Sequence, residues 1–215
     1  MKQDVYVNPK IGRPRDFKED EALHSAMLLF WEYGYESTSM TLLSKKMKLN
    51  APSIYSTFGD KKSLFLKALD LYVGNIKDIE YFLHESSTAF EATRLLLINS
   101  ALRFTGKNTP RGCMLASAVT SCSAQASDLQ VVAGKIRSKI ESFLKLRIQR
   151  DIENKILPKS FSAEGFAGLA LATIQGMSVL ARDGVSRKKM LLIAHTSMIA
   201  WNTSNKIRKP AIFKI

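Results

Sequence analysis

The chain has 215 residues, which allows one domain or two small ones, and 46% of them are hydrophobic, which is ample for a packed core. Its 32 Lys and Arg against 19 Asp and Glu leave a formal net charge of +13, which suits a protein that binds nucleic acid or another anionic surface. The sequence contains no Gly-rich phosphate loop, zinc-protease motif, nucleophile elbow or paired-carboxylate motif, so we do not expect an enzyme.

The first ten residues carry no apolar signal core, and no stretch reaches about 18 uninterrupted apolar residues. We therefore expect a cytoplasmic protein with no membrane partner. The three histidines lack metal-ligand spacing to Cys, Asp or Glu, so we expect no metal and no cofactor. Cys113 and Cys122 are too few for a disulfide framework, and on one helix they would lie about 180° apart. We interpret them as buried thiols, and a redox or metal role stays open.

The apolar residues follow helical spacing along nearly the whole chain, and no alternating strand pattern occurs, so the sequence predicts an all-α fold. Residues 1–15 are expected to form a flexible basic arm, because Gly12 and Pro14 favour extended backbone. The first helix is expected to begin near Asp16 and to stop at Gly34.

Two short helices joined by a tight turn follow, and this layout is typical of a helix-turn-helix. Thr38 or Ser39 caps the first helix, and residues 48–50 form the turn. Asn50 caps the second helix, whose first turn contains Pro52 at a position where the missing N–H costs nothing.

The helix-turn-helix is locally basic, because residues 37–67 hold six Lys and one acid. That acid, Asp60, is the expected cap of a further helix. Its apolar stripe continues to Ile79 and predicts one long helix, the fourth, that joins the two domains.

Three segments within residues 12–70 resemble the N-terminal domain of TetR/AcrR-family regulators: G-R-P-R, L-F-W-E-Y-G-Y-E-S-T-S-M, and L-N-A-P-S-I-Y-S-T-F-G-D-K-K-S-L-F. The positions that match the family pattern are Phe30, Gly34, Tyr35, Thr38, Ser39, Tyr55, Phe58, Lys61 and Leu64. Lys48 departs from it, since the family usually has Gly in the turn, and a left-handed Lys costs about 1 kcal/mol. Asn50 replaces the usual Ser or Thr and remains a good cap.

The chemistry of these residues, together with the resemblance, implies a double-stranded DNA partner. Hydroxyls at a helix start can bind a phosphate. Small residues at the start of the second short helix allow it to approach base edges, and Arg side chains of an arm can enter the minor groove. By resemblance, Tyr55 and Lys61 contact phosphates. The expected DNA-binding residues are Arg13, Arg15, Thr38, Ser39, Asn50, Ala51, Pro52, Ser53, Tyr55, Ser56 and Lys61.

Further helices are predicted over residues 88–105, 113–125, 128–155, 161–182 and 186–202. The resemblance implies that these helices dimerise and hold a small-molecule effector. Small residues at steps of three and four favour close helix packing; the expected homodimer interface is Gly165, Gly168, Ala172, Gly176, Met190, Ala194, Met198 and Trp201. The candidate effector pocket, for an effector of unknown identity, is Phe82, Phe104, Cys113, Met114, Phe143 and Met177.

These observations together predict an all-α protein with four parts: a flexible basic arm (1–15), a helix-turn-helix DNA-binding domain (16–70), a helical effector-binding and dimerisation domain (71–205), and a basic tail (206–215). We expect a ligand-responsive repressor that binds a palindromic operator as a homodimer. The alternative is a non-specific architectural DNA-binding protein, for which the high net charge alone would suffice.

Overall fold

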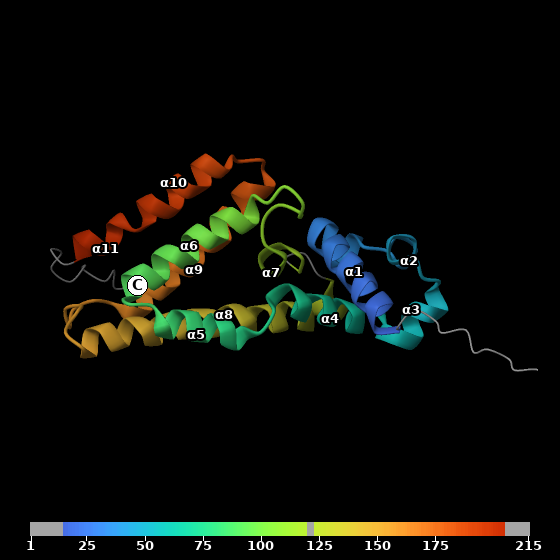
Figure 1. The fold of residues 1–215 in the computed structure, drawn as a ribbon, viewed down its shortest axis with the longest axis horizontal. Coiled ribbons are helices and arrows are strands. Elements are labelled where there is room, and N and C mark those ends of the chain that lie inside the picture. Colours follow the sequence, from blue (N-terminus) through green and yellow to red (C-terminus); the bar gives the residue numbers. More distant parts are fainter. Residues whose placement is uncertain (1–14, 120–122, 205–215) are drawn as a thin grey trace, which may run out of the picture.

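The computed structural model describes residues 15–119 and 123–204. The described residues form eleven α-helices and one short 3-10 helix and no strand, so the predicted all-α class is confirmed. Figure 1 shows an elongated molecule with α1, α2 and α3 at one end and α10 and α11 toward the other.

The helix α1 (Arg15–Ser37) precedes the helix-turn-helix, which consists of α2 (Met40–Met47) and α3 (Ala51–Phe58), and α4 (Lys61–Val73) packs mainly against α1. We call α1 to α4 the head. Gly34 interrupts α1 with a positive φ of 79°, where the sequence predicted a helix stop. Three aromatic rings hold α1 to α4: Phe30 meets Phe65 edge-on at 5.1 Å between ring centroids, and Tyr35 meets Phe65 at 5.3 Å.

The fourth helix is shorter than the sequence predicted. It ends at Val73, and Gly74 leaves the helical path at φ 69° and ψ −158°. Asn75 then caps α5 (Ile76–Glu85), because its side chain accepts a hydrogen bond from the Lys77 N–H at 3.1 Å. The continuous apolar stripe hid this break, since both helices use it to face the interior.

The remaining helices surround a second core. Their bounds are α6 (Ala89–Phe104), α7 (Met114–Ser117), the 3-10 helix η1 (Ala124–Ala126), α8 (Ser127–Glu153), α9 (Ala163–Arg182), α10 (Arg187–Ser197) and α11 (Ile199–Ser204). The predicted helix over 113–125 is the part that differs most, because α7 has four residues and Cys113 precedes it. Cys122 lies outside the described residues.

Two hydrophobic cores meet along the molecule. The first joins α1 to α4 with residues from α7 and the start of α8, including Met114, Leu115 and Leu129. The second joins α5, α6, α9, α10 and the later part of α8. The head is therefore held to the rest of the protein by shared packing as well as by the chain itself.

One described helix, α9, is long and apolar enough to cross a membrane by length and composition alone, and 28% of that stretch is buried. A helix of a folded core meets the same criterion. Ala170, Met177 and Ala181 of α9 lie inside the second core, against α6, α8 and α10. These packed residues account for the apolar character of the inward side of α9.

Candidate DNA interface and effector pocket

The structure confirms the predicted caps and turn of the helix-turn-helix. The Asn50 side chain accepts a hydrogen bond from the Ser53 N–H at 2.8 Å, and Pro52 stands in the first turn of α3. Lys48 takes the left-handed conformation at φ 55° and ψ 38°, as its place in the turn predicted. The Ser44 hydroxyl donates to the Leu49 carbonyl and closes the turn.

The outer face of α3 is available to a partner because its inner face is fixed by the buried side chains of Ile54 and Phe58. On the outer face, Tyr55 is 50% exposed and Pro52 and Ser56 are exposed. Ala51 and Ser53, half-buried at the start of α3, add little bulk. A short helix with such a face can approach base edges in a major groove closely.

Two further predicted phosphate contacts, Ser39 and Lys61, stand at the starts of α2 and α4. Ser39 is exposed and caps α2 by accepting from the Leu42 N–H at 3.1 Å. Lys61 opens α4, and its Nζ donates to the Glu36 carbonyl at 3.3 Å and lies 4.5 Å from the centroid of the Tyr35 ring. These contacts hold the Lys61 ammonium group at the junction of α1 and α4.

Thr38 does not fit its predicted role through its side chain. It is fully buried, and its hydroxyl donates to the Gly34 carbonyl at 2.6 Å, which satisfies the end of the first part of α1. Its hydroxyl is therefore turned away from any phosphate. Arg13 lies outside the described residues, and the structure describes only the backbone of Arg15, the first residue of α1.

The start of α4 also carries a charged cap. The Asp60 carboxylate accepts from the Ser63 N–H at 2.7 Å. This backbone hydrogen bond, aided by one to the Ser63 side chain, holds the pKa of Asp60 below its ordinary value. Asp60 therefore stays ionised at neutral pH and fixes the N-terminus of α4 beside Lys61.

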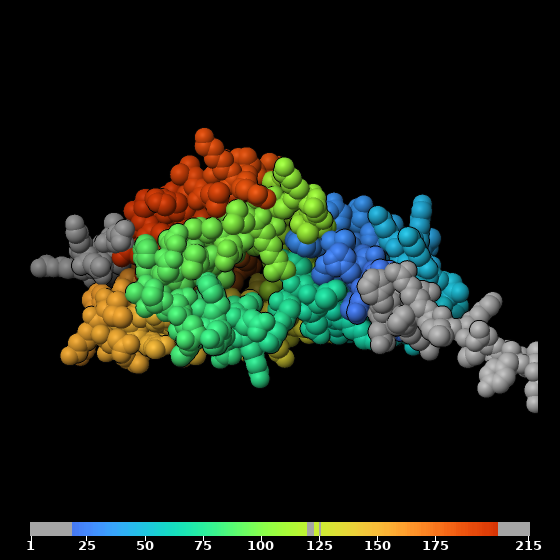
Figure 2. Space-filling view, in the orientation of Figure 1, coloured from blue at the N-terminus to red at the C-terminus, as the bar shows by residue number. Residues whose placement is uncertain are grey.

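A pocket of about 420 Å³ lies at the junction of α4 and α5. Residues of α6, α7, α8 and α9 also line it. Figure 2 shows a hollow on this face of the molecule, between the α4–α5 segment and α6. Much of its wall is apolar, with Ile79, Phe82, Leu96, Ile140, Leu171 and Ile174 among the lining residues. Its size and lining suit a small organic molecule.

Three of the predicted pocket residues, Phe82, Phe104 and Cys113, line this pocket. The other three do not. Met114 packs in the first core and Met177 in the second, both fully buried, and Phe143 borders a smaller hollow between α5 and α8. Sequence periodicity marked all six as interior and could not tell a packed side chain from one at a cavity wall.

The polar part of the wall went unpredicted. It includes Arg103 and Arg137, and the Arg103 guanidinium donates from Nη2 to the Tyr72 carbonyl at 2.6 Å and stacks 4.2 Å from the Tyr72 ring. The Tyr72 hydroxyl donates to Cys113 Sγ at 3.3 Å. Burial and the neighbouring Cys113 raise the pKa of Tyr72, so its hydroxyl remains a donor. Polar residues scattered over several helices give no periodic signal.

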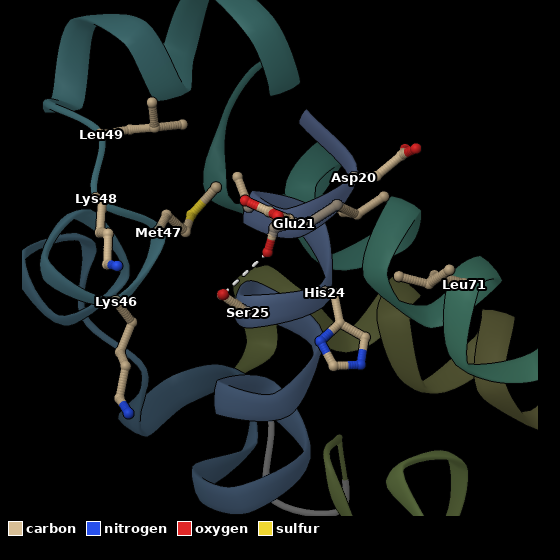
Figure 3. A pocket seen from close by; sticks show the side chains of 11 residues that line it. Asp20, Glu21, His24, Ser25, Lys46, Met47, Lys48, Leu49 and Leu71 are labelled. Atoms are coloured by element: carbon tan, nitrogen blue, oxygen red, sulfur yellow. Dashed lines mark hydrogen bonds between the residues drawn. The ribbon is translucent and has the colours of Figure 1, made fainter. Parts of the chain in front are cut away.

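A wider hollow of about 1010 Å³ lies on the head, between α1, α2 and the end of α4. Figure 3 shows Asp20 and Glu21 on its α1 side and Lys46 and Lys48 on its α2 side. These four side chains are exposed and of both signs. This groove is therefore lined by charges of both signs, whereas the wall of the pocket beside α5 is more apolar.

Hydrogen bonds tie the C-terminal part of α1 directly to α9 and to the loop before α7. The Arg182 guanidinium, at the end of α9, donates to the Trp31 carbonyl at 3.0 Å and to the Glu32 carbonyl at 2.7 Å. The Trp31 Nε1 donates to the Gly112 carbonyl at 3.1 Å. These hydrogen bonds join α9 and the loop before α7 directly to α1, the first helix of the head.

Helix α9 presents a row of small and apolar residues outward. Gly165, Leu169, Ala172, Gly176 and Val179 are all exposed and, at steps of three and four, share one face. Three of these were predicted for the dimer interface, whereas Gly168 is half-buried.

Helix α10 and the start of α11 turn the other predicted interface residues inward. Met190, Ala194, Met198 and Trp201 pack inside the second core at 5% exposure or less. The outward apolar residues of this segment are Leu192 and Ile199, at 61% and 50% exposure. These four side chains therefore face the core of the chain itself, which spacing alone could not show because both sides of the segment carry apolar residues.

Comparison with known proteins agrees with this geometry. The family described as "Bacterial regulatory proteins, tetR family" matches residues 22–68, which span most of the head. The HTH-type transcriptional repressor ComR of Escherichia coli (strain K12) is 33% identical over 205 residues, covering 91% of this chain and 94% of ComR. The HTH-type transcriptional repressor BdcR of the same organism is 32% identical over 124 residues, 56% of this chain and 61% of BdcR.

A similar solved structure is a cysteine mutant of the TetR family transcriptional regulator CifR complexed with 26 bp double-strand operator DNA. It has a TM-score of 0.82 and 31% sequence identity, and the match covers 88% of this chain and all of the CifR chain. The likeness extends through both halves of the molecule, beyond the head. The chain therefore belongs to the tetR family of bacterial regulatory proteins, and it is a DNA-binding transcriptional regulator.

Proposed function

We propose that this protein is a ligand-responsive repressor that binds a palindromic operator as a homodimer. The observation that carries the proposal is the exposed, capped helix α3 on a head tied to α9. Among the residues that the structure describes, none covers the outward face of α9. The relatives ComR and BdcR are named as repressors, and the CifR structure contains operator DNA.

The outward face of α9 supports dimerisation. Gly165, Ala172 and Gly176 let a second helix approach closely, while Leu169 and Val179 offer apolar area at 44% and 59% exposure. Exposed apolar residues that gather on one face, as on α9, are typical of an interaction surface. Two copies related by a two-fold axis would place two heads on one duplex, as a palindrome requires.

The position of the pocket supports control by a ligand. Tyr72, Val73 and Gly74 at the end of α4 line it, so an effector would touch the helix that belongs to the head. We propose that the effector favours an arrangement in which the two α3 helices no longer fit successive major grooves, about 34–36 Å apart. An effector shifts this equilibrium only by its difference in affinity for the two arrangements.

In this proposal, residues 16–70 bind DNA, and residues 71–205 bind the effector and form the dimer. The Arg13 and Arg15 side chains would add minor-groove contacts from the arm. We further propose that the protein acts in the cytoplasm and catalyses no reaction, in keeping with relatives that are transcriptional regulators.

Selection of binding sites from random duplex DNA at near-physiological salt tests the proposal. A recovered palindrome supports a sequence-specific dimer. Recovery of no motif, together with the same steep salt dependence of affinity on every duplex, would contradict it and favour the architectural alternative. Ligand-free protein must be used, because a retained effector would hold the heads apart.

A further inference from the structure

The charges of the pocket beside α5 point to the chemistry of its ligand. Arg103 on α6 and Arg137 on α8 line it, while Asp78 is its one acidic lining residue. The Asp78 carboxylate already accepts a hydrogen bond from the Asn75 side-chain amide at 2.9 Å. Positive charge therefore exceeds negative charge at a wall that is otherwise mostly apolar.

Neither arginine has a carboxylate within ion-pair distance among the described residues. Each uses part of its donor set on a backbone carbonyl: Arg103 on Tyr72, and Arg137 from Nη1 on Leu115 at 2.6 Å. A guanidinium has five N–H donors in a planar fork that matches a carboxylate. Both side chains thus keep donors for an anion beyond the ones these bonds use.

We propose that the pocket binds an organic acid: an apolar body among Phe82, Ile140 and Ile174, with its carboxylate bound by Arg103 and Arg137. The inference rests on the proposed ligand-responsive function and specifies its effector class. A carboxylate entering an apolar pocket needs charge-assisted hydrogen bonds to offset the loss of water, and these two residues supply them.

The same contact gives the acid a route to the head. The Tyr72 carbonyl is one of the last carbonyls of α4, and Arg103 satisfies it next to the break at Gly74. A ligand carboxylate that takes the remaining donors of that guanidinium would shift its position and so weaken its bond to the end of α4. In this proposal, Arg103 binds the ligand carboxylate and also hydrogen-bonds to the end of α4, a helix of the head.

Direct binding to DNA-free protein tests the proposal, by calorimetry with the probes hexanoate, octanoate, decanoate and dodecanoate and with the alcohols of the same lengths. At least one acid is expected to bind more tightly than its matched alcohol. Arg103→Gln and Arg137→Gln should each weaken acid binding by about 10- to 100-fold, while alcohol binding changes little. Arg94→Gln on the same helix α6 is the matched control, because Arg94 pairs with Glu91 and lies outside the pocket lining.

Retained alcohol binding in the Gln variants shows that the pocket is still folded, so a lost cap on α4 cannot imitate the result. Equal affinity for acids and alcohols, unchanged acid affinity in both variants, or no binding by any acid would overturn the proposal. Because no DNA is present, these outcomes leave the proposed DNA reading intact. Release of a selected operator by the acid that binds, and its loss in Arg103→Gln, would confirm the route to the head.

Discussion

A buried ion pair inside the regulatory half allows a quantitative prediction. Arg147 and Asp151 stand one helical turn apart on α8, and their side chains are only 4% and 2% exposed. The distance from Arg147 Nη1 to Asp151 Oδ1 is 2.5 Å. Asp151 also accepts from the Ala89 N–H at 2.7 Å, and Arg147 donates to the Ser86 carbonyl at 2.9 Å. The pair thus ties α8 to the connection between α5 and α6.

The substitution Asp151→Asn keeps the size of the side chain but leaves the Arg147 charge buried without its counterion. The Arg147 Nε already lacks a hydrogen-bond partner among the described residues, so the guanidinium depends strongly on Asp151. Breaking such a buried pair costs about 3–5 kcal/mol. At about 2–4 °C per kcal/mol for a chain of this size, the Tm should fall by about 6–20 °C.

Thermal unfolding followed by circular dichroism, at one fixed protein concentration, measures this shift. Glu91→Gln is the matched control, because Glu91 and Arg94 form a pair on the surface and its loss should change the Tm little. The double variant with Arg147→Met and Asp151→Leu should recover much of the loss, since no buried charge remains. A Tm of Asp151→Asn within about 2 °C of the native value would refute the reasoning.

Four further predictions concern the head, its attachment and the dimer. Gly112→Ala should lower the free energy of unfolding by about 2 kcal/mol or more and weaken DNA binding, because φ is +82° and the new Cβ would lie 2.7 Å from the Ser178 carbonyl oxygen. Thermal melting measures the first effect and fluorescence anisotropy the second. If neither changed, the attachment of α1 to the loop that contains Gly112 would not matter for stability or DNA binding. Leu169→Glu should give a monomer in sedimentation and lose tight operator binding; a stable dimer would place the interface elsewhere. Asn50→Ala should cost about 1 kcal/mol of stability, whereas Tyr55→Phe should weaken all duplexes alike without changing the selected sequence; a changed sequence would mean that Tyr55 reads bases.

Local chemistry explains why much of the head could be predicted. The caps Ser39, Asn50 and Asp60 each bond an N–H three residues ahead, and Lys48 occupies the turn that its position required. These features depend on a few neighbouring residues. Thr38 escaped prediction because a hydroxyl at a helix start can serve the preceding carbonyl as well as a phosphate, and only the packed structure decides.

The pocket and the dimer face could be predicted only in part, because they depend on how distant helices meet. Arg103 and Arg137 come from α6 and α8, and nothing in their local sequence places them on one wall. On α10, apolar residues cover both sides, so spacing alone could not show that Trp201 faces the core and Leu192 the solvent. The break at Gly74 was hidden by an apolar stripe that continues through it.

The central claim is that two heads, held at a fixed spacing by one dimer, read two half-sites. The most direct measurement is the affinity for a selected palindrome compared with the same duplex carrying about half a helical turn inserted at its centre. The account predicts a loss of about 100-fold or more, since the second head then faces the wrong side of the duplex. Equal affinity for the two duplexes would contradict it, because a protein that binds DNA without fixed half-sites does not sense the insertion.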